Sequence, residues 1–488
     1  MLDPTFERAA QAFNRWDLES ALLLCQDHLK RFPKSAPGWR LAGRIHARRR
    51  QWNEAETALA RAAKLTPKDP NLALDKGSMR IIQGRLEEAA THFEAAERLG
   101  GAQSVVGVAA RALRAECVRR LGDPEAALRL LGTPQTSTGW LAASQAHWEL
   151  RRPAEAEEAA RAGLALEGDA NTKLQLHRLL GEILEKGGRH ADAFEQFVLA
   201  KQVVPHRYDA GEFRARIAAI QAYFTAERLA ALPKPTIRTR RPIFIAGLPR
   251  SGTTLLERQL AAHAQGAGAG ETEGLASQVM QWVNPLSPAA SFPRCMDRWM
   301  ASDMDRVAAA YLAETDRFAT PGVERVADKN LTNWENVGLI AAVFPDATIV
   351  HLERDPLDAG ISCFERLNPS AVRWSSNLRD IGEAIGLCSR LMAHWHQVLG
   401  TRLVHVRYEE LVRQPRAALE RVLAAAGLPW DDACLAHQRS KPGAVLPGVT
   451  LSADQVRKPI YDSSIGRGAM FGDLLQPLKD ELRKHGAV

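Results

Sequence analysis

A glycine-rich segment near the middle of the chain contains the residue types that hold a phosphate group. Gly247–Thr254 reads GLPRSGTT and lies between the apolar run Ile243–Ala246 and a stretch of good helix formers. A strand, a tight turn and a helix in this order aim backbone N–H groups and the positive end of the helix at an anion. The outline is close to a Walker A loop, but Thr253 replaces the lysine of an NTPase and the positive charge lies earlier, at Arg250. The pattern therefore predicts a loop for a nucleotide with less negative charge than a triphosphate.

A second group of phosphate-binding side chains follows another apolar run, Ala347–Leu352. Arg354 stands at the end of this run, Ser362 lies in the helix expected after it, and Arg366 lies one further turn along the same helix face. The planar guanidinium fork of arginine can hold two phosphate oxygens at once. Surface ion pairs are the alternative for both arginines, but the nearby phosphate loop favours binding of a second phosphate group.

These two segments together resemble the sulfotransferases that use 3′-phosphoadenosine-5′-phosphosulfate (PAPS), among them the tyrosylprotein sulfotransferases and the bacterial TPR-linked sulfotransferases. The resemblance implies that the 5′-phosphosulfate is held by Arg250, Ser251, Gly252, Thr253 and Thr254. It implies that Arg354, Ser362 and Arg366 hold the 3′-phosphate. Because the 3′-phosphate is what separates PAPS from ATP, this second set would decide which nucleotide binds.

Two later segments extend the resemblance. The run Leu403–Val412, which we interpret as a third strand, is similar to the family segment whose tyrosine packs near the adenine, here Tyr408. Residues 454–459 and Tyr461–Arg467 resemble the segment that closes over the nucleotide, which adds Arg467 to the nucleotide-binding set. Four motifs in the family's order cover about residues 241–480.

The resemblance also implies which residues carry the chemistry. Glu271, in the stretch GETEG at 270–274, takes the place of the family's catalytic glutamate and would be the general base for a hydroxyl acceptor. Its alternative role is to cap the next helix. Lys329, after the strand expected at Val323–Ala327, would stabilise charge on the leaving phosphate, and Arg250 would stabilise the sulfuryl oxygens. No metal is implied, and the product nucleotide is 3′-phosphoadenosine-5′-phosphate (PAP).

The acceptor stays open at this point. Glu273 stands where the tyrosylprotein enzymes have an arginine, which weighs against an acidic tyrosine-containing peptide. A glycan, a lipid or a small metabolite are equally compatible, since acceptor contacts come from loops that vary within a fold. The family's C-terminal active-site serine aligns with Gly466, and Ser463 and Ser464 just upstream are its possible substitutes.

The first two hundred residues repeat with the period of a tetratricopeptide (TPR) unit, about 34 residues. The small and large positions of the pattern recur as Gly43, Ala55, Leu59 and Pro67, then as Gly77, Ala89 and Phe93, and last as Gly181, Ala193, Phe197 and Pro205. Degenerate copies around Leu113–Leu130 and Trp140–Ala160 bring the count to five or six, enough to bury a continuous core. We expect this array to bind a protein partner or to mediate self-association; a packing module without a ligand is equally compatible.

Composition adds limits on partners and location. The formal net charge of +7 is spread over many arginines without an aromatic-rich basic cluster, so we expect no nucleic-acid partner. The six cysteines lie far apart, which favours reduced thiols over a disulfide framework or a zinc site. Residues 1–20 are charged throughout and no apolar run has the length of a membrane span, so we expect a cytoplasmic protein.

The sequence therefore predicts an all-α TPR solenoid followed by an α/β, P-loop-like sulfotransferase domain with a central parallel sheet. The expected boundaries are 1–205 for the repeats, 206–241 for a helical connector and linker, and 242–488 for the catalytic domain. Two alternatives remain: a kinase or NTPase that uses the same loop, and a TPR adaptor whose second domain binds a nucleotide without catalysis.

Overall fold

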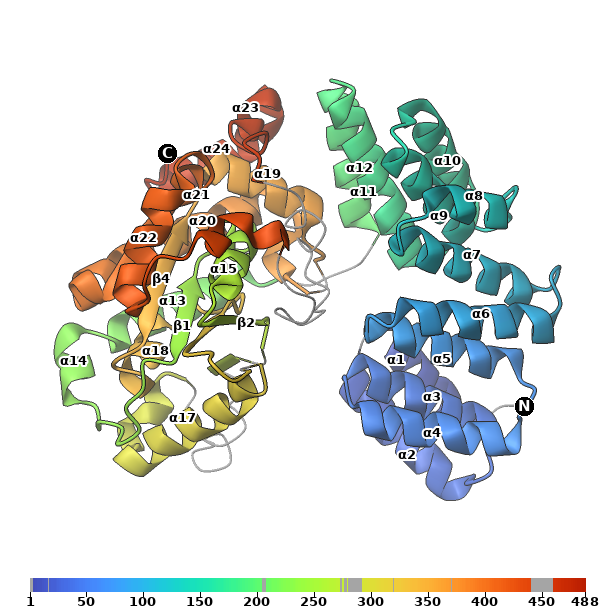
Figure 1. Cartoon of the computed structure of the whole chain (residues 1–488), viewed down its shortest axis with the longest axis horizontal. Helices are drawn as coiled ribbons and strands as arrows, with labels where there is room; N and C mark the ends of the chain where they lie inside the picture. The colour runs from blue at the N-terminus through green and yellow to red at the C-terminus, as the bar shows by residue number, and fades with distance from the viewer. Residues whose placement is uncertain are drawn as a thin grey trace. The chain divides into compact units, whose positions relative to one another are not determined.

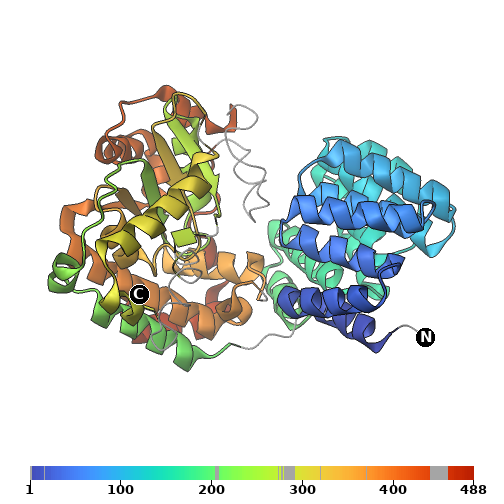
Figure 2. The same cartoon turned by 90° about the horizontal axis from the view of Figure 1, so that it is seen from below.

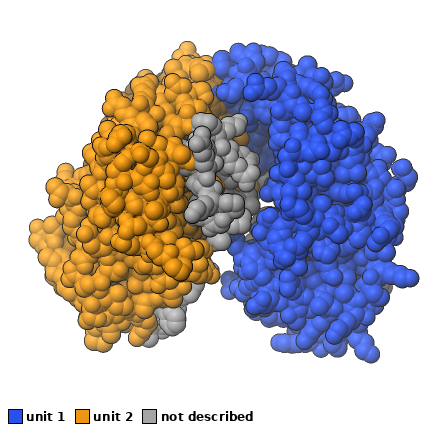
Figure 3. Space-filling view, viewed as in Figure 1, with its two compact units in different colours: residues 1–204 blue, residues 205–488 orange. Residues whose placement is uncertain are grey.

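The chain folds into two compact units, residues 1–204 and 205–488 (Figure 3). The computed structural model describes residues 3–15, 17–203, 208–272, 274, 275, 279, 292–318, 320–369, 371–439 and 460–488. Within these ranges no helix is both long enough and apolar enough to cross a lipid bilayer.

Unit 1 is helical throughout its described part. Its helices are α1 Pro4–Asn14, α2 Leu18–Arg31, α3 Ala36–Arg48, α4 Trp52–Leu65, α5 Pro70–Ile82, α6 Leu86–Gly100, α7 Val105–Arg120, α8 Pro124–Leu131, α9 Ser137–Glu149, α10 Pro153–Ala165, α11 Ala170–Lys186 and α12 His190–Gln202. Each odd-numbered helix packs on the even-numbered helix that follows it, and the hairpins stack in sequence order (Figure 1, Figure 2). The predicted TPR solenoid is confirmed.

The repeat glycines explain how the two helices of a hairpin approach so closely. A Cβ atom on Gly43 would lie 2.6 Å from the Leu59 side chain. On Gly77 it would lie 2.5 Å from the ring of Phe93, and on Gly181 it would lie 2.3 Å from the ring of Phe197. The small residue of the first helix therefore receives the large residue of the second, and this contact recurs with the sequence repeat.

Unit 2 is built on a five-stranded, entirely parallel sheet with the order β2-β3-β1-β4-β5. The strands are β1 Pro242–Ala246, β2 Gly266–Gly270, β3 Arg325–Asp328, β4 Thr348–Glu353 and β5 Leu403–Arg407. The α-helices are α13 Ala210–Tyr223, α14 Ala226–Ala231, α15 Thr253–Ala262, α17 Ala301–Asp316, α18 Val337–Val343, α19 Pro356–Arg366, α20 Leu378–Leu399, α21 Tyr408–Arg413, α22 Pro415–Ala426, α23 Arg467–Met470 and α24 Gln476–Lys484. The predicted parallel α/β fold is confirmed.

Helices cover both faces of the sheet, which is why β1 is apolar along its whole length. On one face Ile243 and Ile245 pack with Leu256 of α15 and Leu419 of α22. On the other face Phe244 packs against Tyr311 of α17, with 5.3 Å between the ring centres. All five residues of β1 are buried, so the strand that leads into the glycine loop is held on both sides.

One predicted element is wrong. The run Leu403–Val412 was expected to be a single strand, but β5 ends at Arg407 and α21 begins at Tyr408. Glu409 and Glu410 stand in the first turn of this helix, where carboxylates interact favourably with its positive end. Leu411 is fully buried in the core, a contact that the helical turn provides.

Helix α13 packs within unit 2. Phe213, Ile217 and Ile220 are buried on one of its faces, and Arg214 forms an ion pair with Glu383 of α20. After α13, Phe224 is fully buried against Gly338 of α18, where a Cβ atom would lie 2.5 Å from its ring. The segment before the first strand is therefore part of the core of unit 2.

Candidate active site

Five of the predicted site residues follow the carboxyl ends of the five parallel strands. Arg250 lies in the loop after β1, Glu271 follows β2, Lys329 follows β3, Arg354 follows β4 and Tyr408 follows β5. Carboxyl ends of parallel strands share one edge of a sheet, and this edge is where open α/β sheets bind ligands. The fold thus places residues that are far apart in the sequence at one edge.

The glycine loop has the backbone conformation of an anion-binding turn. Gly252 has a φ of 97° and precedes the first residue of α15, and Arg250 is one of the few non-glycine residues with a positive φ, 73°. Ser251, Thr253 and Thr254 are buried, so their hydroxyl groups are held in the loop. A Cβ atom on Gly252 would lie 2.4 Å from the ring of Tyr408, so only glycine fits here.

Contacts join the glycine loop to the second arginine motif. Arg250 Nε donates a hydrogen bond of 3.0 Å to Ser362 Oγ. Arg354 Nη1 donates one of 2.9 Å to the Arg250 carbonyl oxygen, and the Arg354 guanidinium lies 4.6 Å from the centre of the Tyr408 ring. Four residues that the sequence assigned to nucleotide binding therefore touch one another, and Tyr408 lies beneath Arg354 and Gly252.

A carboxylate absent from the sequence prediction compensates this positive charge. Glu365 is almost fully buried and forms ion pairs with Arg366 at 2.7 Å and with Arg467 at 2.6 Å. Burial alone would raise the pKa of Glu365, but Arg366, Arg467 and Arg250 together lower it to about 2. Burial and the neighbouring Arg366 in turn lower the pKa of Arg250 to about 10. Residues 250, 366 and 467 thus gather around one buried anion.

The C-terminal segment is bound to the same helix. Asp358 of α19 is buried and accepts hydrogen bonds from the backbone N–H groups of Gly466, at 2.7 Å, and Gly468, at 2.6 Å. Arg354 Nη2 donates a bond of 2.6 Å to the Ser464 carbonyl oxygen. Residues 464–468 therefore contact Arg354 and the helix that follows it, whereas residues 454–459 of the predicted closing segment lie outside the described residues.

The two residues predicted to carry the chemistry form an ion pair. Lys329 Nζ contacts Glu271 Oε1 directly. The Lys329 side chain is 3% exposed and that of Glu271 is 38% exposed, so the cation is held in the protein and the carboxylate faces the solvent side. Glu273, the other acidic residue of this stretch, lies outside the described residues. A partly exposed carboxylate beside a buried cation can accept a proton from an incoming hydroxyl group.

Asp328, the residue before Lys329, is held by three side chains, and no role was predicted for it. This fully buried carboxylate accepts hydrogen bonds from Tyr311 Oη at 2.8 Å, Thr272 Oγ1 at 3.0 Å and Asn333 Nδ2 at 2.8 Å. The donors come from α17, the end of β2 and the turn after β3. These three donors meet only in the folded chain, so the sequence could not predict their contacts. The position of Asp328 next to the predicted lysine was the one available signal.

The residues present fit a nucleotide with a phosphate group near Arg354. Among the described residues, the buried Nε of Arg354 has no hydrogen-bond acceptor, although its two other nitrogens are engaged. An unpaired buried donor costs free energy until an acceptor arrives, on the order of 1–3 kcal/mol. A phosphate oxygen is an acceptor of the right kind and charge.

Three histidines form a separate cluster where β4 and β5 meet α20. His351 Nδ1 lies 3.0 Å from His396 Nε2, and His405 stacks on His351 with 4.9 Å between the ring centres. Glu353 binds His405 Nε2 at 2.8 Å. Burial, together with the neighbouring His405, lowers the pKa of His351 to about 3. Within the described ranges no group of three His, Cys, Asp or Glu side chains is arranged to hold a metal ion.

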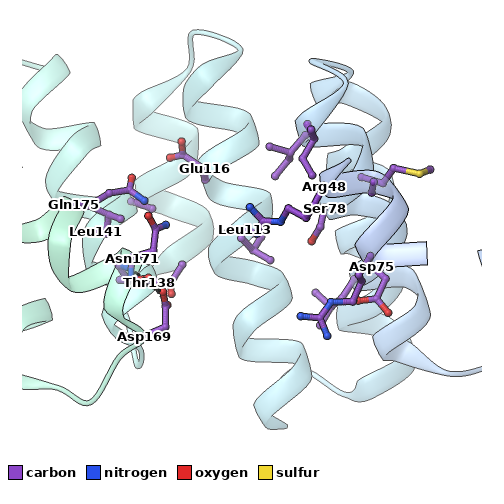
Figure 4. Close-up of a pocket in the computed structure, with 18 of the residues that line it drawn as sticks. Arg48, Asp75, Ser78, Leu113, Glu116, Thr138, Leu141, Asp169, Asn171 and Gln175 are labelled. Carbon is purple, nitrogen blue, oxygen red and sulfur yellow. Dashed lines mark hydrogen bonds and ion pairs between the residues drawn. The ribbon is translucent and has the colours of Figure 1, made fainter. Parts of the chain in front are cut away.

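Unit 1 has a cavity of its own, of about 650 Å³. It is lined by the first helices of successive hairpins, with Arg48, Asp75, Glu116, Asn171 and Gln175 among the polar side chains that face it (Figure 4). Asp75 is paired with Arg40 at 2.6 Å, and burial raises its pKa. The lining is mixed in charge and rich in side-chain amides.

Comparison with known proteins bears on unit 2. Residues 242–432 match the model of the sulfotransferase family. An uncharacterized protein of Aquifex aeolicus (strain VF5) is 30% identical over 319 residues, which cover 63% of this chain and 41% of that protein. Protein-tyrosine sulfotransferase 2 of Gallus gallus is 26% identical over 244 residues, 48% of this chain and 66% of that enzyme.

A solved structure, the sulfotransferase domain from the olefin synthase of Synechococcus PCC 7002, has a TM-score of 0.33 at 21% identity and covers 52% of this chain and 98% of that domain. The chain spans less than two thirds of the length of the two relatives named above. Residues 242–432 of unit 2 match the sulfotransferase family, and the similar proteins include protein-tyrosine sulfotransferases, as the motifs predicted.

Proposed function

We propose that unit 2, with its sulfotransferase family match, transfers a sulfuryl group from PAPS to a hydroxyl acceptor and releases PAP. The observation that carries this proposal is the shared edge of the sheet, where a carboxylate–lysine pair and an arginine cluster follow neighbouring strands. The pair is Glu271 with Lys329, and the cluster includes Arg250 and Arg354. The cluster has the charge and the unpaired donor that a bisphosphorylated nucleotide would use.

In this proposal each residue has one task. Glu271 accepts the proton of the acceptor hydroxyl while the acceptor oxygen forms a bond to sulfur. The bond from sulfur to the bridging phosphate oxygen breaks, and Lys329 stabilises the charge left on that oxygen. Arg250 and the loop residues 251–254 hold the sulfuryl and 5′-phosphate oxygens, and Arg354, Ser362 and Arg366 hold the 3′-phosphate. Arg467 pairs with Glu365, which also pairs with Arg366, and the Tyr408 ring packs against the Arg354 guanidinium.

Protein tyrosine is our first candidate for the acceptor. The relatives of this chain include protein-tyrosine sulfotransferases. The exposed side of Glu271 leaves room for an acceptor that approaches from solvent. A glycan, lipid or metabolite hydroxyl would use the same base, so an acceptor screen with labelled PAPS must include all four classes.

The cavity of unit 1 is our candidate for a protein partner. It lies among the inner helices of the repeats, whose mixed charge and side-chain amides suit an extended peptide. Self-association through the same array is the alternative. Sedimentation of the full chain, with and without Asn171→Ala and Arg48→Glu, distinguishes a peptide partner from self-association. If a second copy of the chain binds in this cavity, the wild type should form dimers and these variants should weaken them.

The deciding experiment is calorimetric binding of PAP, ADP and ATP to the full chain and to Arg354→Ala. We expect PAP to bind more tightly than ADP, and the variant to lose about tenfold or more of that advantage. Arg416→Ala is the matched control, because Arg416 also lies over an aromatic ring, 4.7 Å from the centre of Trp430, but is exposed and pairs with Glu420, which belongs to no predicted site. Equal binding of ATP and PAP would contradict the proposal and favour a kinase or NTPase. PAP binding without turnover of labelled PAPS across the acceptor screen would favour the non-catalytic adaptor.

A further inference from the structure

A buried carboxyl group lies behind the Glu271–Lys329 pair. Glu257 is on α15, one turn after the threonines of the phosphate loop, and is 1% exposed. Its Oε1 atom accepts a hydrogen bond of 2.6 Å from the backbone N–H of Gly270. Gly270 is the last residue of β2 and directly precedes Glu271. Glu257 therefore touches the backbone that carries the proposed base.

Gly270 connects Glu257 with Lys329. Its N–H group points to Glu257, and its carbonyl oxygen accepts a bond of 3.2 Å from the backbone N–H of Lys329. The residue has a φ of 70°, and the pairing of β2 with β3 shifts register between Gly268 and Gly270. The strand end is irregular here, so its position depends on contacts other than the regular ladder.

The strand also makes room for the carboxyl group. A Cβ atom on Gly268 would lie 2.9 Å from Glu257 Oε1 and 3.3 Å from Glu257 Cγ. Only a residue without a side chain lets α15 bring a carboxylate this close to β2. Gly268 thus leaves the space that the Glu257 side chain occupies, and Gly270 donates the hydrogen bond that it accepts.

The charge of Glu257 depends on the pH near neutrality. Burial raises its pKa to about 7, although Lys329, Arg258 and the bond from Gly270 act to lower it; Asp328 acts to raise it. The bond from a backbone N–H is stronger to an ionised than to a protonated carboxyl group. Deprotonation of Glu257 should therefore tighten its hold on Gly270 and add a negative charge in the field of Lys329.

We propose that Glu257 is a positioning residue of the sulfuryl-transfer site, which fixes Gly270 and thereby sets Glu271 opposite Lys329. The inference rests on the proposed function of unit 2. It adds to that site an ionisable residue, Glu257, on the helix that follows the phosphate loop. Glu257 touches neither substrate in this scheme; it acts through the backbone of β2. A residue that serves only to fill the core would make the same packing contacts but would leave the pH dependence of catalysis unchanged.

The test compares two variants of the full chain across pH 5.5–9. Glu257→Gln keeps an acceptor oxygen for Gly270 but cannot ionise, and Glu257→Met keeps the volume but loses the acceptor. The matched control is Glu335→Gln, because Glu335 is also buried with a raised pKa but pairs with Arg216 at 3.1 Å. Turnover of labelled PAPS gives kcat and KM, and a 15N-glycine NMR spectrum follows the Gly270 amide.

We expect wild-type kcat to rise through a step near pH 7, and Glu257→Gln to lose that step. Glu257→Met should lower kcat by about tenfold or more while the KM for PAPS changes less than about threefold, since nucleotide contacts remain. A step that persists in Glu257→Gln, or wild-type kcat in Glu257→Met, would overturn the inference. The control variant Glu335→Gln should have the same kcat and the same pH dependence of kcat as the wild type.

The NMR signal separates the two proposals. A strongly hydrogen-bonded glycine amide that shifts with pH in the wild type and stays fixed in Glu257→Gln reports the Glu257–Gly270 contact without any turnover. If that signal is present but no acceptor is sulfated and PAP does not bind, the proposed function fails and the contact stands. If sulfuryl transfer is observed but no glycine amide follows Glu257, the positioning role fails and the function stands.

Discussion

Single residues with strongly shifted pKa values show where buried charges of opposite sign compensate one another in this site. Glu365 is the clearest case, because one buried carboxylate neutralises arginines from the loop, from α19 and from the C-terminal segment. The sequence predicted the arginines, because Arg250 lies in the glycine loop and Arg366 and Arg467 lie in segments that resemble the family's nucleotide-binding motifs. It could not predict Glu365, Asp328 or Glu257, because their roles come from elements that meet only in the folded chain.

We expect Glu365→Gln to destabilise the protein in a pH-dependent way. The folded-state pKa of Glu365, about 2, is below its ordinary value of 4.5, so its contribution is present above pH 4.5 and is lost as the pH falls toward 2. The free energy of unfolding at pH 7 should fall by on the order of 2–3 kcal/mol. Urea denaturation between pH 3.5 and 7 measures this, and a difference that does not shrink at acid pH would rule out the charge as its cause.

Glu271→Gln should lower kcat by about 10²–10⁴ because it removes the proposed general base. The nucleotide contacts come from other strands, so the Kd for PAP should stay within about twofold. Labelled PAPS turnover and calorimetry measure the two effects. Glu420→Gln, which removes an exposed carboxylate paired with Arg416, is the control and should leave both unchanged. A parallel loss of PAP binding in Glu271→Gln would place Glu271 in the nucleotide site instead.

At the scale of elements, the strand ends carry the site, and the sequence predicted them unevenly. The apolar runs before Gly247 and Arg354 were recognised as strands because buried parallel strands are continuously apolar. Strand β2, GAGAG, was not recognised, because glycine and alanine have low strand propensity. Its alanines pack against Val326 of β3, so burial in the sheet decides its conformation.

Gly252→Ala tests the turn that starts α15. Alanine at a φ of 97° is strained, and its Cβ atom would meet the Tyr408 ring at 2.4 Å. We expect PAP affinity to fall by about tenfold or more, since backbone strain of this kind costs on the order of 1–3 kcal/mol. Adding Tyr408→Ala removes the clash but leaves the strain and removes a side chain of the proposed nucleotide site, so we expect no recovery of affinity. Calorimetry of both variants measures this; unchanged affinity in Gly252→Ala would show that the loop is not where PAP binds.

At the scale of the whole molecule, every proposed catalytic and nucleotide-binding residue lies in unit 2. The repeat array was predictable because small and large residues recur with its period, and every strand of the sheet except β2 was predictable because it precedes a motif. The sequence assigned residues 206–241 to a connector, whereas α13 packs into unit 2 through Phe213 and through pairs with Glu335 and Glu383. Such long-range pairs have no local signal.

We therefore expect a fragment of residues 205–488 to bind PAP as the full chain does. A fragment that begins at residue 242 should aggregate or melt at a lower temperature, because it leaves Glu335 and Glu383 buried without their arginines. Thermal melting and calorimetry of both fragments measure this. Equal stability of the two fragments would show that α13 is dispensable and that the domain begins at the first strand.

Arg354 has a consequence for the order of events in a catalytic cycle. Its guanidinium holds the Arg250 carbonyl with one nitrogen and the Ser464 carbonyl with another, so in the proposed reaction the same side chain would contact the donor and hold the C-terminal segment. A donor that must reach Arg354 is expected to enter first, and its spent form to leave last. Steady-state kinetics should then show PAP as a competitive inhibitor against PAPS and a noncompetitive one against the acceptor. A random order would mean that the segment opens independently of the nucleotide.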